Sequence, residues 1–167
     1  MEYRRLNSQD FESYFANRLR ALQQTPSAFL VTYAEAKEGD QSHYKNTLAC
    51  IGKENLIFGA LNEGQVVATL GLSQEERSST KHKAIIWGMA VDIEYRKRGI
   101  AAKLLDMAIQ FAKDEMKVKL VQLSVEANNL PARKLYESRG FKIWGTEPKT
   151  LFINGNYYDD DHMALVF

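Results

Sequence analysis

Apolar and polar positions recur with two different periods along the first half of the chain. A short strand is expected around Tyr3–Leu6, followed by a helix over about Phe11–Gln23, in which apolar residues recur every three or four positions. A second helix is expected over about Gln41–Gly52. The apolar runs at Leu56–Leu61 and Gln65–Leu72 then have the length and composition of strands.

Two short turns predict hairpins. Asn62-Glu63-Gly64 lies between the two strands just described, and Asn154-Gly155-Asn156 lies between two strands expected from Phe141 onward. Asn and Gly readily adopt the left-handed conformation that tight hairpin turns require. The segment Ser73–Lys83 contains no apolar side chain and is expected to connect two strands.

The second half has the pattern of a strand, a helix and a parallel strand. Ala84–Val91 is continuously apolar, as expected of a central strand covered on both faces. A helix over Gly99–Met116 and a strand over Val118–Val125 follow, and a crossover of this length joins two parallel strands. A further helix is expected over Leu130–Ser138, ending at Gly140. The pattern predicts an α/β fold whose mixed sheet has its parallel pair in the middle.

Composition agrees with a globular protein. The 167 residues have the size of one domain, covering 1–167, with 45% hydrophobic and 26% charged residues. The formal net charge is +1, so no overall field recruits nucleic acid or a membrane surface. No stretch reaches the ~18 apolar residues of a membrane helix, and the N-terminus lacks a signal-peptide pattern. We therefore expect a cytoplasmic protein.

The loop Asp92–Ala101, between the central strand and the next helix, carries the strongest chemical signal. A helix N-terminus at the carboxyl end of a strand offers free N–H groups and a positive dipole end to an anion. Gly99 permits close backbone approach. On the residues alone, a solvated helix start and a short basic patch for nucleic acid stay open, whereas the lack of a GK[ST] motif excludes a Walker loop. The basic residues here are Arg96, Lys97, Arg98 and Lys103.

Two blocks of sequence resemble the Gcn5-related N-acetyltransferase (GNAT) family. Arg96-x-x-Gly99-x-Ala101, after an apolar strand ending in Met89-Ala90-Val91, is similar to the family's acetyl-CoA signature. Val125–Asn129 and Ala132–Phe141 are similar to its fifth strand and following helix. The resemblance covers about residues 84–145. It implies an acyltransferase, an acetyl-CoA-dependent N-acetyltransferase, on a largely antiparallel sheet whose central parallel pair splays apart, with helices on both faces.

The resemblance also implies which residues bind acetyl-CoA. The loop and helix start wrap the pyrophosphate, mainly through backbone N–H groups. The end of the central strand binds the pantetheine arm as an added strand would. An asparagine after the second parallel strand contacts the cofactor. The implied cofactor-binding residues are Met89, Ala90, Val91, Arg96, Lys97, Arg98, Gly99, Ile100, Ala101 and Asn129.

Tyr136 resembles the family tyrosine that faces the thioester sulfur. An amine attacks the thioester carbonyl directly, a thiolate leaves, and a phenol can protonate it. Packing within a short helix stays open as the alternative role. The attacking ammonium must also lose a proton, and the strand glutamate that accepts it in some family members is replaced by Ile85. Glu126, Glu35, His82 or a chain of water molecules are the remaining candidates for that base.

The acceptor side carries no motif that names its substrate. By the resemblance, Phe29, Tyr33 and Glu35 border the acceptor, a primary amine on a small molecule or a peptide. The run Asp159–His162 is expected to form a turn and strand edge, with a wall of the acceptor pocket as the alternative. No metal site is expected.

Two other functional classes compete with the enzyme. A non-catalytic acyl-CoA-binding or sensory module of the same fold is disfavoured by the retained Tyr136 and favoured by the missing strand glutamate. A nucleic-acid-binding domain would bind DNA with steep salt dependence, and the near-neutral charge argues against it. Cys50, the only cysteine, excludes an internal disulfide and is expected to be a small buried apolar residue. A homodimer is left open.

Overall fold

One mixed sheet of seven strands runs through the molecule. The computed structural model describes all residues, 1–167. The strand order is β1-β2-β3-β4-β5-β7-β6, and neighbours are antiparallel except β4 and β5. The strands are β1 (Glu2–Arg5), β2 (Asn55–Asn62), β3 (Gln65–Gln74), β4 (Lys83–Val91), β5 (Leu120–Glu126), β6 (Lys142–Ile153) and β7 (Asn156–Val166). The helices are η1 (Ser8–Asp10), α1 (Phe11–Gln24), η2 (Pro26–Ala28), α2 (Tyr33–Glu38), α3 (Ser42–Ala49), η3 (Ile93–Tyr95), α4 (Ile100–Asp114) and α5 (Leu130–Glu137), where η marks a 3₁₀ turn.

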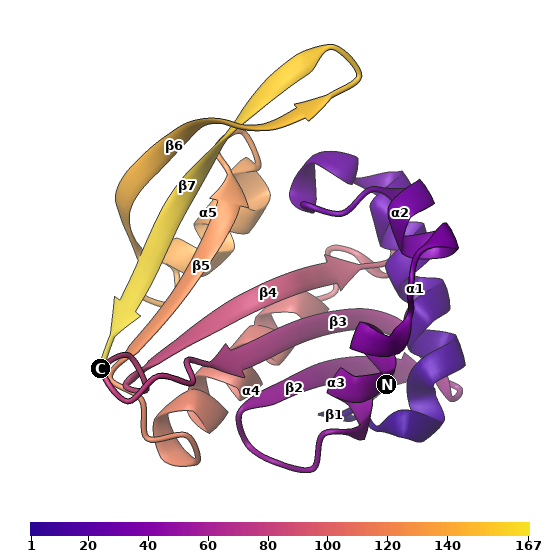
Figure 1. The fold of residues 1–167 in the computed structure, drawn as a ribbon, viewed down its shortest axis with the longest axis horizontal. Coiled ribbons are helices and arrows are strands. Elements are labelled where there is room, and N and C mark those ends of the chain that lie inside the picture. Colours follow the sequence, from indigo (N-terminus) through magenta and orange to yellow (C-terminus); the bar gives the residue numbers. More distant parts are fainter.

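The parallel strands β4 and β5 separate soon after they pair. Backbone pairing joins only Lys83–Ile85 of β4 to Leu120–Gln122 of β5. Beyond these residues β4 stays paired with β3 as far as Val91, and β5 stays paired with β7 as far as Glu126. Figure 1 shows the two strands diverging toward their carboxyl ends. The predicted splayed parallel pair is confirmed, and one edge of β4 is left without a strand partner.

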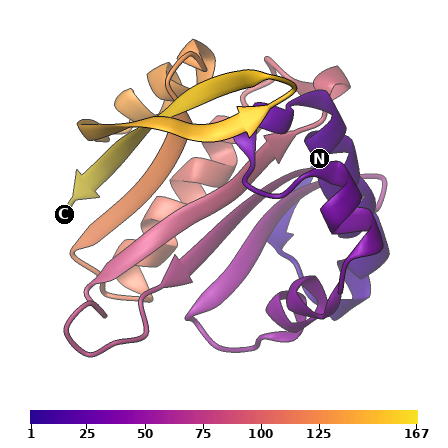
Figure 2. The same cartoon turned by 45° about the horizontal axis from the view of Figure 1, so that its top comes forward.

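Helices cover both faces of the sheet. On one face, Leu104, Leu105 and Ala108 of α4 are fully buried in the larger core, against β2, β3 and β4. The opposite face is covered by α1, α2 and α3, where Tyr14 of α1 packs with Leu48 of α3. In Figure 2 the β6–β7 hairpin extends toward the side of the N-terminal helices, and η2 contacts both β5 and β6. On this second face η2 therefore bridges the two parts of the splayed sheet.

The turns and most elements agree with the sequence pattern. Glu63 and Gly64 have φ angles of 51° and 79°, and Asn154 and Gly155 have 51° and 81°. Positive φ at both central residues is what a type I′ hairpin turn requires, so both predicted hairpins are confirmed. None of the helices is long and apolar enough to span a membrane.

The helix predicted over about Gln41–Gly52 is present as α3, Ser42–Ala49. A further short helix, α2, precedes it and was not predicted from the sequence. A reciprocal capping box between Thr32 and Glu35 starts α2, and Gly39 follows its last residue. Because α2 has six residues and buries only Ala36, it is too short for apolar periodicity to reveal it.

β4 is also less covered than its apolar sequence suggested. Ala84 and Ile86 are buried, but the residues from Trp87 to Val91 are only half-buried. The physical reason is the splay: the carboxyl-terminal part of β4 has lost its neighbour β5 and faces a cleft instead of a continuous sheet.

Candidate active site

A cleft of about 780 Å³ lies where β4 and β5 separate. Its walls come from both strands, the loop before α4, α5, and the end of α1 with η2. Most of the lining side chains are hydrophobic, and a few polar groups project among them. The predicted site residues that line it are Phe29, Met89, Ala90, Val91, Arg96, Lys97, Gly99, Ile100, Ala101, Asn129 and Tyr136.

The N-terminus of α4 opens into this cleft. Gly99 is the N-cap residue, with a left-handed φ of 74°, and no side chain caps the helix. The first helical hydrogen bond runs from the Lys103 N–H to the Gly99 carbonyl, so the N–H groups of Ile100, Ala101 and Ala102 lack partners within the helix. A Cβ built on Gly99 would meet nothing within 4 Å. Unpaired backbone donors therefore point to open space at the positive end of the helix dipole.

The basic side chains of this loop have different positions. Arg96 donates from Nε to the Val91 carbonyl at 3.0 Å, which fastens the loop to the end of β4. Lys97 lines the cleft and has a positive φ of 62°. Arg98 donates from Nη2 to the Glu94 carbonyl at 2.8 Å and does not line the cleft. Arg98 is therefore the one residue of the predicted cofactor-binding loop whose side chain bonds to the loop and lies outside the cleft.

Tyr136 reaches the cleft from α5. Its side chain is 6% exposed and meets Phe141 edge to face, with ring centroids 5.9 Å apart. The hydroxyl donates to Sδ of Met89 on the splayed part of β4, at 3.2 Å. Burial raises the pKa of Tyr136 to about 12. At neutral pH the phenol therefore keeps its proton while facing the gap between β4 and β5.

Asn129 lies at the junction between β5 and α5. Its Oδ1 accepts from the backbone N–H of Ala132 at 3.3 Å and so caps α5. With the oxygen used in this way, the Nδ2 amide is the group that remains to donate to a ligand in the cleft.

Of the side chains predicted as candidates for the base, Glu126 alone lines the cleft. Its Oε2 accepts from Oγ of Ser27 on η2 at 2.9 Å. Glu35 instead accepts from Thr32 in the capping box of α2, and these hydrogen bonds lower the pKa of Glu35. His82 lies in the β3–β4 connection, outside the cleft.

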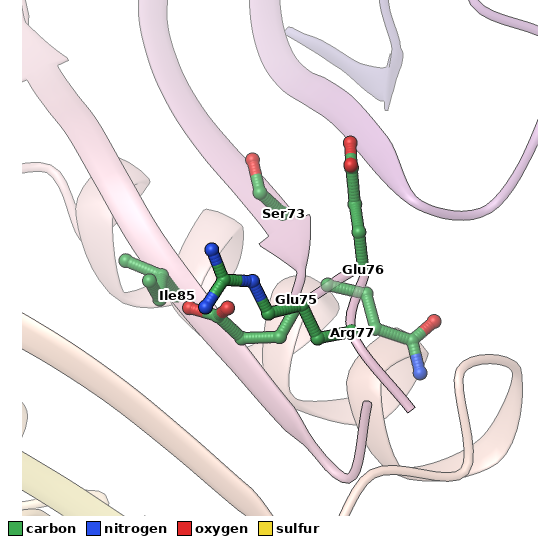
Figure 3. A pocket seen from close by; sticks show the side chains of 6 residues that line it. Ser73, Glu75, Glu76, Arg77 and Ile85 are labelled. Carbon is green, nitrogen blue, oxygen red and sulfur yellow. The ribbon is translucent and has the colours of Figure 1, made fainter. Parts of the chain in front are cut away.

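Ile85, which takes the place of the family's strand glutamate, lies outside the large cleft. It lines a separate hollow of about 250 Å³ at the β3–β4 connection. Figure 3 shows its side chain near those of Glu75 and Arg77. Since the rest of β4 carries no acidic residue, this strand brings no carboxylate to the cleft.

The expectation that the run Asp159–His162 forms a turn and strand edge is wrong. The run lies within β7, which pairs with β5 on one side and β6 on the other, because β6 takes the edge of the sheet. Asp160 stands opposite both Glu126 of β5 and Glu147 of β6. Residues paired across strands share a face, so three carboxylates form one row beside the cleft.

Asp160 is the buried member of this row. It is 9% exposed, and its Oδ1 has no hydrogen-bond partner. Burial raises the pKa of its carboxyl group; His162 opposes the shift, and the carboxylates of Glu147 and Glu126 add to it. The sequence pattern missed this feature because it depends on which strands become neighbours.

Replacing Asp160 with Asn is expected to stabilise the fold at neutral pH. A carboxyl group whose pKa is raised on folding stabilises the protein while it is protonated, and loses that contribution as pH rises past its ordinary value of ~3.9. The amide of the variant removes the charge but still leaves one polar atom without a partner, so the unfolding free energy at pH 7 should increase by only about 1 kcal/mol or less. Denaturant unfolding at pH 7 and pH 3 measures this, and a gain of equal size at both pH values would contradict it.

Of the three predicted acceptor contacts, Phe29 alone lines the cleft and is buried. Tyr33 and Glu35 belong to α2, outside its lining. Cys50 follows the last residue of α3 and is half-buried, not buried as expected, and it does not line the cleft.

Comparison with known proteins agrees with this geometry. The acetyltransferase (GNAT) family matches residues 16–141. The L-amino acid N-acetyltransferase AaaT of Escherichia coli is 32% identical over 127 residues, which cover 76% of this chain and 71% of that protein. An N-alpha-acetyltransferase of Saccharolobus solfataricus is 32% identical over 53% of this chain and 49% of its own.

Solved structures share the whole fold. An acetyltransferase of the GNAT family from Streptococcus pneumoniae superposes with a TM-score of 0.82 at 21% identity, covering 99% of both chains. The protein yncA from Salmonella typhimurium, solved with its cofactor acetyl-CoA, has a TM-score of 0.79 at 15% identity and covers 99% of this chain and 93% of its own. With the splayed strands, the open helix N-terminus and the family match over most of its length, the chain belongs to the GNAT family of acetyl-CoA-dependent N-acetyltransferases.

Proposed function

We propose that this cleft transfers the acetyl group of acetyl-CoA directly to a primary amine, without a covalent enzyme intermediate. The observation that carries the proposal is the gap between β4 and β5, which has an open helix N-terminus and a protonated tyrosine on its walls. Cys50 lies outside the cleft, so no thiol is placed to carry the acetyl group.

Two features of the backbone suit acetyl-CoA. The pyrophosphate fits the unpaired N–H groups at the start of α4, beside Lys97. The pantetheine arm fits the unpartnered edge of β4 from Met89 to Val91, whose free backbone groups can bind it as they would bind a strand. The Nδ2 amide of Asn129 can donate to the same arm. The thioester then lies beside the hydroxyl of Tyr136.

Tyr136 acts on the departing thiolate. A thiol has an ordinary pKa near ~8.5, whereas the pKa of Tyr136 is about 12, so complete proton transfer from this phenol is uphill. The hydroxyl therefore works chiefly by donating a hydrogen bond as negative charge develops on sulfur, and the proton follows as the thiol forms.

Glu126 acts on the incoming amine. A lysine-like amine with a pKa near ~10.4 is only roughly 0.04% neutral at pH 7, so a proton acceptor on its path speeds the attack. Glu126 lines the cleft, and Asp160 is its neighbour across the β5–β7 pair. Together they attract an ammonium ion and offer a carboxylate to take its proton.

The experiment is to measure thiol release from acetyl-CoA with a panel of primary amines, alongside calorimetric titration with acetyl-CoA. Acetyl-CoA should bind without an amine, and at least one class of amine should release thiol. Binding with no release across the panel would favour the non-catalytic acyl-CoA-binding module. The names of the relatives include amino acid and N-alpha acetyltransferases, so the panel needs both small amines and peptides. A cytoplasmic location and any homodimer remain predictions.

Replacing Glu126 with Gln is expected to lower kcat/KM for the amine by about 10–10²-fold, at the low end of general-base effects because Asp160 stands beside it. The loss should shrink as pH rises and more of the amine is neutral on its own. Acetyl-CoA affinity should not change. Steady-state kinetics from pH 6 to 10 test this, with Glu76→Gln on the exposed β3–β4 connection as the control. A loss that is equal at every pH would argue against proton removal by Glu126.

A further inference from the structure

Arg18 of α1 is a buried cation for which the structure gives no hydrogen bond or ion pair. The residue is 8% exposed, yet neither Nε nor Nη1 of its guanidinium has a hydrogen-bond partner, and no acidic side chain forms an ion pair with it. A buried charge is costly unless it is paired and hydrogen-bonded. The unsatisfied guanidinium is therefore suited to pair with an anion.

The guanidinium lies against residues that line the cleft, although Arg18 itself is not part of the lining. Its Cζ lies 4.3 Å from the centroid of the Phe29 ring, and its Nη1 lies 3.5 Å from where a Cβ on Gly88 would be. Both Phe29 and Gly88 line the cleft. Because Gly88 has no side chain, β4 offers Nη1 of Arg18 no side-chain partner here.

Arg20, two residues farther along α1, differs from Arg18 because its guanidinium is paired with an acidic side chain of the protein. Arg20 donates to both carboxylate oxygens of Asp92, with the shortest contact 2.8 Å, and Asn17 donates to the same carboxylate at 2.9 Å. No corresponding acid approaches Arg18. Arg20 therefore forms a structural ion pair, whereas Arg18 has no acidic partner.

We propose that Arg18 binds the carboxylate of the acceptor, and that the acceptor is a free α-amino acid. This inference rests on the proposed acetyl transfer to an amine. A guanidinium matches a carboxylate with two parallel hydrogen bonds, and both become strong in a site that excludes water. The phosphates of acetyl-CoA have their own place at the start of α4, so the anion at Arg18 belongs to the second substrate.

Arg18 and Tyr136 approach neighbouring residues of β4. Nη1 of Arg18 lies beside Gly88, and the Tyr136 hydroxyl contacts the side chain of Met89, the next residue. We therefore expect an acceptor whose anion lies near its amine. In an α-amino acid one carbon separates the two groups.

The carboxylates of β5 and β7 complete the match. Glu126 reaches the cleft, and the unpartnered Oδ1 of Asp160 lies on the same face. Ser27, on the turn that leads to Phe29, holds Glu126 by a hydrogen bond. A zwitterionic amino acid would thus place its carboxylate near Arg18 on the α1 side and its ammonium group near the carboxylates on the β5 side. The N-terminal residue of a peptide carries a neutral amide in place of that carboxylate and so lacks the negative charge that Arg18 would bind.

The test compares L-amino acids with their carboxamides as acceptors, for example L-leucine with L-leucinamide. The amide contains the weaker base and the larger fraction of neutral amine, so simple reactivity favours it. The wild-type protein is expected to prefer the free acid by about 10–10²-fold in kcat/KM for the amino acids it accepts, the worth of about 1.4–2.8 kcal/mol for a charge-assisted pair. Arg18→Met should remove that preference and leave the KM for acetyl-CoA unchanged, and Arg18→Lys should restore part of it. Arg77→Met, on the exposed β3–β4 connection, is the control cation.

Stability separates recognition from a structural role. Because Arg18 has no hydrogen bond or ion pair to lose, only its contact with the Phe29 ring, Arg18→Met should fold with a melting temperature close to or above that of the wild type. A lower melting temperature with an unchanged acid preference would make Arg18 structural and overturn the proposal. Equal use of acids and amides by the wild type would overturn it while acetyl transfer stands. If no amine releases thiol, the proposed function fails, and calorimetric binding of L-amino acids against their amides, in the presence of CoA, still decides whether Arg18 selects the carboxylate.

Discussion

A protein carrying Gly99→Glu is expected to fold and to lose measurable binding of acetyl-CoA. Gly99 has a φ of 74°, so any side chain there costs about 1–2 kcal/mol of backbone strain, which most folds tolerate. The position is otherwise open, because a Cβ meets nothing within 4 Å. The Glu carboxylate would therefore project into the space in front of the free N–H groups of α4. It would occupy the anion site and repel the pyrophosphate.

Gly99→Gln is the matched control, since it has the same size and the same strain without the charge. Calorimetric titration with acetyl-CoA should show weakened binding for Gln and none for Glu, and circular dichroism should show that both fold. If Glu and Gln weaken binding equally, bulk and strain explain the loss and the anion site lies elsewhere. Unchanged affinity in a folded Gly99→Glu protein would remove the α4 terminus from the cofactor site altogether.

Features that depend on local sequence could be predicted. The apolar run Ala84–Val91 indicated a central strand because continuous burial needs continuous apolar side chains, and both hairpin turns were visible because few residues adopt positive φ. The glycine at the start of α4 was visible for the same reason. Splaying of the parallel pair came from the family resemblance, and the burial of the run was overestimated because periodicity does not report a missing neighbour.

Features that depend on tertiary neighbours could not be predicted. Arg18 and Arg20 lie two residues apart on one helix, and nothing in their sequence says that one meets Asp92 and the other meets no acid. The run around Asp160 resembled a turn because three consecutive acids rarely lie within a sheet. In the structure the run lies inside the sheet, because β7 stands between β5 and β6, and Asp160 is paired with Glu126.

The two sides of the cleft divide the chemistry. Val125 of β5 lies in the core on the α4 side, and successive residues of a strand point to opposite faces, so Glu126 points to the α1 side. Tyr136 belongs to the α4-side core and meets the cleft at Met89. In the proposed reaction the amine therefore attacks the thioester carbonyl from the α1 side, and the sulfur departs toward the Tyr136 hydroxyl on the α4 side, through the gap that the splay opens.

Replacing Tyr136 with Phe is expected to lower kcat by about 10²–10³-fold, the usual worth of one hydrogen-bond donor to developing negative charge, with acetyl-CoA affinity nearly unchanged. The substitution removes only the hydroxyl, whose sole partner is the sulfur of Met89, so the packing against Phe141 and the fold should persist. Because the pKa of Tyr136 is about 12, its deprotonation should not limit the wild-type rate below about pH 10.

Steady-state kinetics with the best amine, together with titration of acetyl-CoA, decide among the roles of Tyr136. A wild-type kcat in the Phe protein would leave Tyr136 as a packed aromatic residue of α5. A collapse of cofactor affinity would make it a binding residue, because its hydroxyl would then matter before any bond breaks. A small loss of kcat calls for single-turnover measurement, since slow product release hides a chemical defect. If acetyl transfer in a single turnover also stays at the wild-type rate, the thiolate leaves without help from this hydroxyl.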